Sequence, residues 1–539
     1  MNLLLLLAIP LLTALLVLAA RNASQVRWIS LLGAAVQLAS TLGLYLAFRH
    51  ERAVGNAAQF LFEQQYNMFS SLKIGFHLGV DGISVAMILL TAFVVVAGVL
   101  VSWNVEKMTK EFYFLLILLS LGAYGFFISL DLFILFFFLE IAVIPKYLLI
   151  GIWGSGKKEY SANKLALMLM GGSALVLVGL LGVYFSASVK SFDLVILSKG
   201  IVSPEVQNIC FPLLFAGFGV FTALFPFHTW VPDGHSSAPT AGSMFLAGIS
   251  MKLGGYGCLR VATYLLPQGA QHYANVVIAL SVIAIVYGAF ATMMQKDLKY
   301  INAYSSVSHC GFVLLGIGML TKTSMTGAVM QMVSHGLMTA LFFAVIGMIY
   351  DRTHTRQVSE MGGLLKTMPF IGSVLFIVGL CSLGLPGLSG FVAEMTVFMG
   401  SWENPDRFSR IATILSCLSI VVTAVYILRA VGKVAMGPIR ADFAALPDAT
   451  SHLLPPPSAD PAGCLRPDRT IDGASCQQIT HGELFYPPPR TGSPGGRARG
   501  LALVILLRYP VFTPLRGRCW AARAGLAERG TCAPPGTLG

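Results

Sequence analysis

Apolar runs long enough to cross a membrane recur along most of this 539-residue sequence. A transmembrane helix needs roughly 20 predominantly apolar residues to span a hydrocarbon core of about 30 Å. Charged residues make up only 11% of the chain, whereas an ordinary soluble domain has about 25%. The sequence therefore predicts an all-α polytopic membrane protein with thirteen transmembrane helices, at 2–20, 28–48, 84–103, 112–130, 132–153, 164–186, 209–231, 241–265, 273–294, 302–320, 325–350, 371–399 and 410–434.

The loops between these runs differ in their content of basic residues. When alternate loops are assigned to opposite sides, fourteen Lys and Arg residues fall on one side and eight on the other. Short cytoplasmic loops carry an excess of these residues, so we expect the N-terminus on the outer side of a bacterial inner (plasma) membrane. The first run has no basic residue before it and Arg21 directly after it. We therefore expect a retained span and not a cleaved signal peptide.

Charge and cysteine content exclude several functional classes. The net charge of +12 does not indicate nucleic-acid binding, because the basic residues lie mostly between apolar runs. The nine cysteines are scattered and form no C-x-x-C pair. This argues against an iron–sulfur cluster, a structural zinc site and a disulfide framework. We expect no cofactor and no metal site in this chain.

The sequence after about residue 450 has a different composition. Residues 451–539 contain thirteen of the 26 prolines and ten Arg but no Lys. Two interpretations stay open: a disordered tail rich in Pro, Gly and Arg, or translation out of frame from GC-rich codons. The nucleotide sequence around codon 450 would distinguish them. No function is assigned to this segment.

Gly and Pro interrupt two of the predicted helices at corresponding places in the two halves of the chain. One interruption is LFPFHTWVPDGHSSAPTAG (224–242) and the other is LGLPGLSGFVAE (383–394). Paired broken helices are typical of inverted-repeat transporters, in which the ion path lies at the breaks. The predicted organisation is N-terminal helices one to three (1–110), a first repeat with helices four to eight (111–268), a second repeat with helices nine to thirteen (269–436), and the aberrant tail (437–539).

A few ionisable residues lie well inside the predicted spans. Each charged side chain at the centre of a bilayer costs about 2.5–3.5 kcal/mol on insertion scales, so such residues usually face a polar interior and handle ions. Buried carboxyl and amine groups in contact exchange protons as a coupled pair, and histidine titrates near neutral pH. The alternative is that they only form hydrogen bonds between helices. The candidate proton-path residues are Glu140, Lys146, Lys252, His309, His335 and Glu394.

Eight segments in order resemble the M-type antiporter-like subunits of respiratory complex I. The resemblance covers about residues 1–449, and a plastid or cyanobacterial D-type counterpart is not distinguished by motif alone. It implies fourteen helices, two inverted five-helix repeats, broken helices seven and twelve, and a line of buried charges. The segments are FHLGVDGISVAMILLT (76–91), the Glu140 helix, FPFHTWVPDGHSSAPTAGS, MKLGGYG (251–257), DLKYINAYSSVSHCGF (297–312), SHGLMTALFF (334–343), YDRTHTR (350–356) and LPGLSGFVAE.

The resemblance also assigns roles by motif position. Glu140 matches the helix-five glutamate, Lys252 the helix-eight lysine and Glu394 the helix-twelve acid. The histidines of helices ten and eleven correspond to His309 and His335. Protons would move from the cytoplasmic side towards Lys252, then past the histidines to Glu394, while Glu140 sets the affinity of the central site.

Two departures from the family pattern concern the charged residues and the end of the bundle. Helix seven of the family usually has a lysine and a proline where this sequence has Phe221 and Ala223, and helix five usually has a neutral residue in place of Lys146. Our hypothesis is that Lys146 supplies the missing base. A structure in which the Lys146 amine lies in lipid, away from Glu140 and Phe221, would contradict it. No fourteenth apolar run precedes the tail.

These observations predict a proton-translocating membrane subunit of NADH:quinone oxidoreductase. Electron transfer would take place in other subunits, so this chain would have no redox centre, and its partners would be neighbouring antiporter-like subunits, the lipid bilayer and protons. One alternative is a subunit of a multi-subunit cation/proton antiporter, which the genomic neighbourhood would reveal. The other is a structural scaffold, which normal pumping by variants at Glu140 and Lys252 would support.

Overall fold

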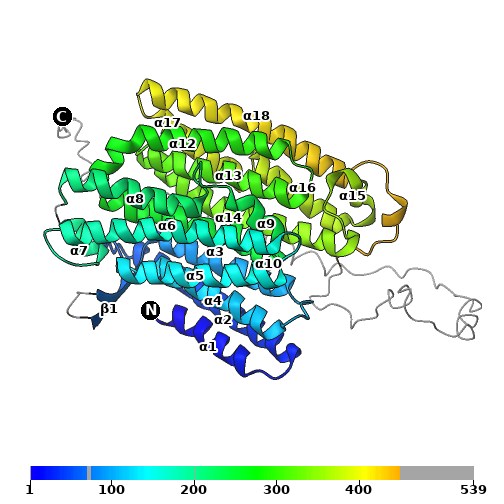
Figure 1. Cartoon of the computed structure of the whole chain (residues 1–539), viewed down its shortest axis with the longest axis horizontal. Coiled ribbons are helices and arrows are strands. Elements are labelled where there is room, and N and C mark those ends of the chain that lie inside the picture. The colour runs from blue at the N-terminus through cyan, green and yellow to red at the C-terminus, as the bar shows by residue number, and fades with distance from the viewer. Residues whose placement is uncertain (1, 70–73, 201, 450–539) are drawn as a thin grey trace, which may run out of the picture. The chain divides into compact units, whose positions relative to one another are not determined.

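The computed structural model describes residues 2–69, 74–200 and 202–449 of the chain. Within these residues, nine helices are long and apolar enough to cross a membrane, and two shorter apolar helices, α1 and α16, accompany them. The helices lie side by side (Figure 1). The chain is a multi-pass membrane protein, as predicted, whereas the count of thirteen spans stays a prediction. The two interpretations of the tail after residue 450 concern residues outside the described part.

The helices of the first half of the chain are connected mostly by short loops, and most begin within a few residues of the predicted apolar run. They are α1 (Leu5–Ala19), α2 (Ala23–Ala53), α3 (Gly82–Val101), α4 (Thr109–Ile128), α5 (Leu132–Trp153), α6 (Lys158–Ser186), α7 (Leu194–Lys199), α8 (Pro204–Thr222), α9 (Trp230–Ser237), α10 (Thr240–Phe245), η1 (Leu246–Ser250), α11 (Met251–Gly257) and η2 (Cys258–Thr263).

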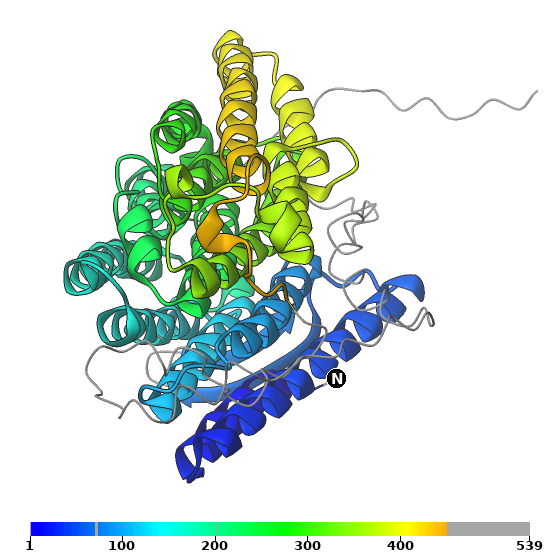
Figure 2. The same cartoon turned by 90° about the vertical axis from the view of Figure 1, so that its right-hand side faces the viewer.

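The second half of the chain repeats this arrangement of long helices and short connections. It contains α12 (Pro267–Met293), α13 (Leu298–Gly318), α14 (Lys322–Thr353), η3 (Val358–Glu360), α15 (Leu364–Thr367), α16 (Pro369–Leu383), α17 (Ser389–Trp402), α18 (Arg407–Ala435) and η4 (Ala441–Phe443). Helix α1 lies on one side of the bundle and α18 on the opposite side in both views (Figures 1 and 2).

Aspartate residues begin several of the long helices. Asp131 accepts hydrogen bonds from the backbone N–H groups of Phe133 and Ile134, at 2.9 and 3.1 Å. Asp81, Asp297 and Asp406 begin α3, α13 and α18 in the same way. An N-cap carboxylate satisfies N–H groups that have no partner inside the helix. This explains why the apolar runs start as helices directly after an Asp.

Both predicted interruptions coincide with gaps between helices. Helix α8 ends at Thr222, and Ala223 has the left-handed backbone conformation, with φ of 68°. Proline cannot adopt this conformation, because its ring holds φ near −65°. The Ala found where the family usually has Pro is therefore compatible with this ending of α8. Helix α16 likewise ends at Leu383, before Gly384 with φ of 76°.

The helix that carries Lys252 is irregular, which its apolar run did not indicate. The segment η1 has π-helical geometry, α11 follows it directly, and η2 is again π-helical. A π-helical stretch inserts an extra residue into the helix and often occurs at functional sites. Lys252 is the second residue after η1, so the local widening of the helix affects where its side chain points.

The two halves of the chain each form a row of packed helices. Helices α4, α5, α6 and α8 pack in sequence in the first half, and α12, α13, α14 and α17 do so in the second. Contacts of α8 with α12 join the two rows, and α10 and η1 of the first half also contact α14. In the first row, Gly254 of α11 lies against Thr222 of α8, since a Cβ at Gly254 would be 2.3 Å from Thr222 Oγ1. This contact brings the end of α8 against the Lys252 helix.

A β-hairpin between α2 and α3 was not anticipated by the sequence analysis. Strands β1 (Leu61–Phe69) and β2 (Ile74–Val80) pair antiparallel, with Gln65 opposite His77. The His77 Nδ1 atom lies 2.7 Å from Asp193 Oδ2, and its Nε2 atom lies 3.4 Å from Glu63 Oε2. Burial alone would lower the pKa of His77, but the Asp193 and Glu63 carboxylates outweigh it and raise the pKa above its ordinary value.

Candidate functional site

Lys252 and His335 form a buried pair between α11 and α14. The Lys252 ammonium donates to the backbone carbonyl of Ala247, and its Nζ atom lies 2.7 Å from His335 Nδ1. Only 1% of each residue is exposed. The pair can exist as an ammonium with a neutral imidazole that accepts the bond, or as a neutral amine with an imidazole N–H that donates it. One proton can therefore be shared between the two residues.

His309 and Glu394 form a second buried pair, between α13 and α17. The His309 Nδ1 atom lies 3.3 Å from Glu394 Oε1 and also 3.3 Å from the amide nitrogen of Gln331. Its Nε2 atom lies 3.3 Å from the hydroxyl of Ser382. When His309 Nδ1 carries no proton, it accepts a hydrogen bond from Gln331, and when it is protonated, it donates one to Glu394. The two contacts therefore belong to different protonation states of the ring.

The two pairs meet through the histidine rings. The ring centroids of His335 and His309 are 5.2 Å apart, and His335 Nε2 is buried without a hydrogen-bond partner in the described part of the chain. The structure thus brings together four of the six residues that the sequence analysis selected. They come from four different helices and form one line, which we call the α11–α17 cluster: Lys252, His335, His309 and Glu394.

The break between α16 and α17 leaves space for the Glu394 carboxylate beside Gly384. Gly384 has φ of 76°, and a Cβ there would lie 2.6 Å from Glu394 Oε2. Any larger side chain would therefore displace the carboxylate as well as strain the backbone. The predicted interruption LGLPGLSGFVAE therefore places the Gly384 backbone against an acid, and in transporters the ion sites lie at such breaks.

Glu140 and Lys146 lie together in α5 but apart from the cluster. Lys146 is 2% exposed, and its Nζ atom lies 5.8 Å from the ring centroid of Phe221. Glu140 is half-buried and interacts electrostatically with Lys146. In the described residues, neither has a hydrogen bond or ion pair with a cluster residue, and Lys146 Nζ and Glu140 Oε1 have no hydrogen-bond partner. Lys146 therefore faces the protein interior beside Phe221.

Comparison with known proteins identifies the family. The family described as NADH:quinone oxidoreductase/Mrp antiporter, TM, matches residues 129–419. NADH-quinone oxidoreductase subunit M of Rickettsia bellii is 35% identical over 415 residues, which are 76% of this chain and 82% of that protein. The chain belongs to this family.

Further matches agree with the predicted M-type resemblance and with the fold. NAD(P)H-quinone oxidoreductase chain 4-2 of Synechocystis is 35% identical over 426 residues, covering 78% of this chain and 76% of that one. A chain of respiratory complex I from Thermus thermophilus superposes with a TM-score of 0.76 and 25% identity, covering 83% of this chain and 91% of that chain. The predicted family and its antiporter-like helical fold are confirmed.

Sequence reasoning missed three basic residues of this family member, of which His235 and Lys299 are buried and Arg356 is half-buried. His235 at the end of α9 is fully buried, its ring stacks on Phe343 with centroids 4.9 Å apart, and neither ring nitrogen has a hydrogen-bond partner within the described residues. Lys299 and Arg356 donate to the carbonyls of Ala238 and Ser236, both at 2.8 Å. All three lie in or directly after the quoted motifs, where His and Lys among small residues were the available signal.

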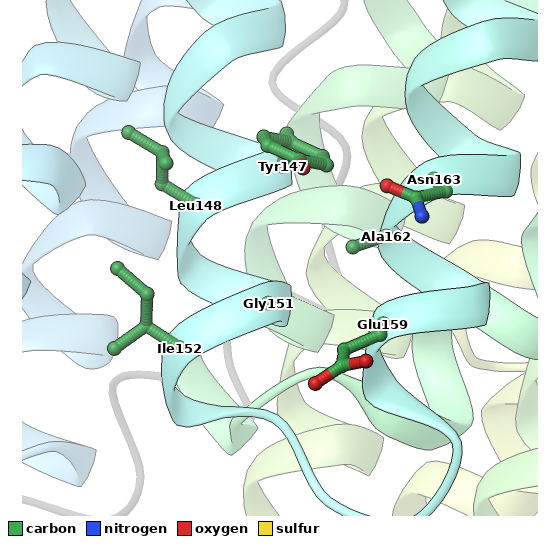
Figure 3. Close-up of a pocket in the computed structure, with 7 residues that line it drawn as sticks. All are labelled: Tyr147, Leu148, Gly151, Ile152, Glu159, Ala162 and Asn163. Carbon is green, nitrogen blue, oxygen red and sulfur yellow. The ribbon is translucent and has the colours of Figure 1, made fainter.

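A groove between α5 and α6 does not contain the cluster. It measures about 360 Å³ and lies on the outside between the two helices, where Asn163 lies opposite Tyr147 and Glu159 lies nearer Gly151 (Figure 3). Nor do three or more His, Cys, Asp or Glu side chains of the described residues converge in a metal-binding arrangement. The chemistry that the cluster supports is the transfer of protons between its own side chains.

Proposed function

We propose that this chain is a proton-translocating membrane subunit of NADH:quinone oxidoreductase. The observation that carries the proposal is the α11–α17 cluster, a line of four buried, titratable side chains within a member of this family. The electron-transfer chemistry would take place in other subunits of the complex. Its partners would be neighbouring membrane subunits, its location the bacterial inner membrane, and its N-terminus would lie on the outer side.

The proton would move along the cluster by successive exchanges. It passes from the Lys252 ammonium to His335 Nδ1, then between the two imidazoles, and from His309 Nδ1 to the Glu394 carboxylate. When the proton leaves His309, the Gln331 amide donates to the bare Nδ1 and stabilises the neutral ring. Glu140 acts on the path through its charge and not through a hydrogen bond.

This transfer needs an external source of free energy. Moving one proton against the membrane potential requires about 2.3 kcal/mol per 100 mV. Proton exchange within the cluster does not supply this free energy, because each exchange is reversible. We infer that quinone reduction elsewhere in the complex drives the cycle, and that a cation gradient does not.

The function is tested in the assembled complex, reconstituted in vesicles. We expect Lys252→Met to reduce NADH-driven acidification about a hundredfold, because a proton-transfer group contributes about that factor or more. Lys157→Met, at an exposed lysine directly before α6, is the matched control and should pump normally. Normal pumping by an assembled Lys252→Met complex would refute the proposal and support a structural role.

The related antiporter function makes a different prediction. The family description includes Mrp antiporters. If this chain served as an antiporter subunit, vesicles containing its complex would exchange Na⁺ for protons in the absence of NADH. We expect no such exchange, and NADH-driven pumping that is independent of Na⁺.

A further inference from the structure

Lys146 is a buried cationic residue with an unusual position in its helix. The residues around it on α5 alternate between two faces. Ile144 and Tyr147 are exposed at the outer surface by 62% and 38%, whereas Lys146 is 2% exposed. A lysine near the middle of a membrane helix that served only to reach the lipid headgroups would extend along the outer face. This one is directed into the protein.

The surroundings of the Lys146 amine are not those of a structural ion pair. Its Nζ atom has no hydrogen-bond partner in the described residues. The nearest charged influence is Glu140, and the Phe221 ring lies 5.8 Å away. An isolated buried charge is expensive, and an ionisable residue retained at membrane depth is a functional candidate. A group in this setting can gain or lose a proton when the charge of Glu140 changes.

The helix before Lys146 contains a carbonyl that lacks its regular helical donor. Lys252 donates to the carbonyl of Ala247, five residues earlier, where the helix is π-helical. Pro145 has no N–H, so the regular helical hydrogen bond to the carbonyl of Ile141 cannot form. Ile141 is five residues before Lys146, the same separation as between Ala247 and Lys252. Each lysine therefore has a carbonyl five residues before it, although only the Lys252 amine donates to its own.

A short chain of contacts connects Lys146 to the cluster. Phe221, against which the amine lies, is followed by Thr222 at the end of α8. Thr222 contacts Gly254, two residues after Lys252. A movement of the Lys146 amine between Phe221 and the Ile141 carbonyl would thus act on the turn of α8 that supports the Lys252 helix.

We infer that Lys146 is a proton-exchanging base that forms an acid–base pair with Glu140 within α5. The proton of the Lys146 ammonium passes to the Glu140 carboxylate, which gives a neutral amine and a carboxylic acid, and the reverse step restores both charges. No other reactant is required, although water can carry the proton between them. The inference rests on the proposed function and adds a second site of proton exchange to the α11–α17 cluster.

The first test replaces the amine with an apolar group of similar length. Lys146→Met should leave the complex assembled, because an unpaired buried amine contributes little to stability. We expect its NADH-driven proton pumping to fall about a hundredfold, the lower end of what a proton-transfer group contributes. The matched control is Lys157→Met, which should pump normally. Normal pumping by Lys146→Met would overturn the inference.

The second test moves the amine to the opposing helix. Phe221 is 1% exposed and faces the Lys146 amine, so a lysine side chain there would place its amine in the same space. The double variant Lys146→Met/Phe221→Lys should recover at least about a tenth of the wild-type pumping rate. An assembled double variant that pumps no better than Lys146→Met would contradict the inference. An amine in the same space would then not replace the Lys146 amine.

A parallel measurement separates this inference from the proposed function. Lys252→Met is assayed in the same preparation. If both Lys252→Met and Lys146→Met pump normally, the proposed function itself fails. If Lys252→Met does not pump and Lys146→Met does, only the role of Lys146 fails.

Discussion

The α5 site and the α11–α17 cluster contain the same kinds of side chain in opposite arrangements. In the cluster, Lys252 and Glu394 each lie within 3.3 Å of a histidine nitrogen. In α5, the Lys146 amine has no hydrogen-bond partner among the described residues, and neither does the Oε1 atom of Glu140. Contact allows a proton to pass directly, whereas separation allows one charge to act on another. The cluster is therefore arranged as a direct path, whereas the α5 pair, whose two groups are not in contact, exchanges its proton through water and acts on the cluster by the change of charge.

Removing the acid at the end of the path is expected to have the largest effect. Glu394→Gln keeps the shape of the side chain but cannot accept a proton from His309. Pumping by the reconstituted complex should fall about a thousandfold, within the range for a general acid or base. The readout is vesicle acidification per NADH oxidised. A variant that pumps at even a tenth of the wild-type rate would show that the path does not end at Glu394.

Displacing the same acid, without changing it, should have a smaller effect. Gly384→Ala places a Cβ 2.6 Å from Glu394 Oε2, and we expect about a tenfold loss of pumping, since small misplacements of a reacting group slow transfer substantially. Gly387→Ala is the matched control. It shares the positive φ, at 96°, but a Cβ there has no neighbour within 4 Å. Both variants should lose about 1 kcal/mol of stability, and equal pumping by the two would contradict the role of the Glu394 position.

The Gln331 amide distinguishes a path from a simple ion pair. It donates to His309 Nδ1 when this atom carries no proton. Gln331→Leu removes the donor, so the proton should remain longer between His309 and Glu394. A lost hydrogen bond of about 0.5–1 kcal/mol corresponds to a two- to fivefold slower cycle. An unchanged pumping rate would indicate that His309 does not return to its neutral form in each cycle.

The smallest expected effect lies outside both sites, in the β-hairpin. Because the pKa of His77 is raised in the fold, its contacts with Asp193 and Glu63 are fully present below its ordinary pKa and are lost as the pH rises through the raised value. Hydrogen-exchange protection of strand β2 should therefore decrease with pH over this window. His77→Gln should abolish the dependence, and His272→Gln, at an exposed histidine of α12, should preserve it. Protection that is independent of pH in the wild type would refute this.

Single residues show how far the sequence alone could predict the site. Glu140, Lys252 and Glu394 stood out because charge is rare in apolar runs, and the motifs placed His309 and His335. The partnership of Lys252 with His335, 83 residues away, depends on how α11 packs against α14, which no periodicity indicates. The amino-acid composition does not predict the π-helical geometry of η1, the left-handed conformation of Ala223 or the β-hairpin. His235 was overlooked because a lone histidine in a motif also suits a packed core.

The central claim is that one proton path connects Lys252 to Glu394. Infrared difference spectroscopy of the assembled complex, with and without NADH, measures it most directly through the absorption of a protonated carboxyl group. The account predicts a band that is present in the wild type, absent in Glu394→Gln, and also absent in Lys252→Met, since the proton reaches Glu394 only through Lys252. A Glu394 band that persists in the Lys252→Met complex would contradict it.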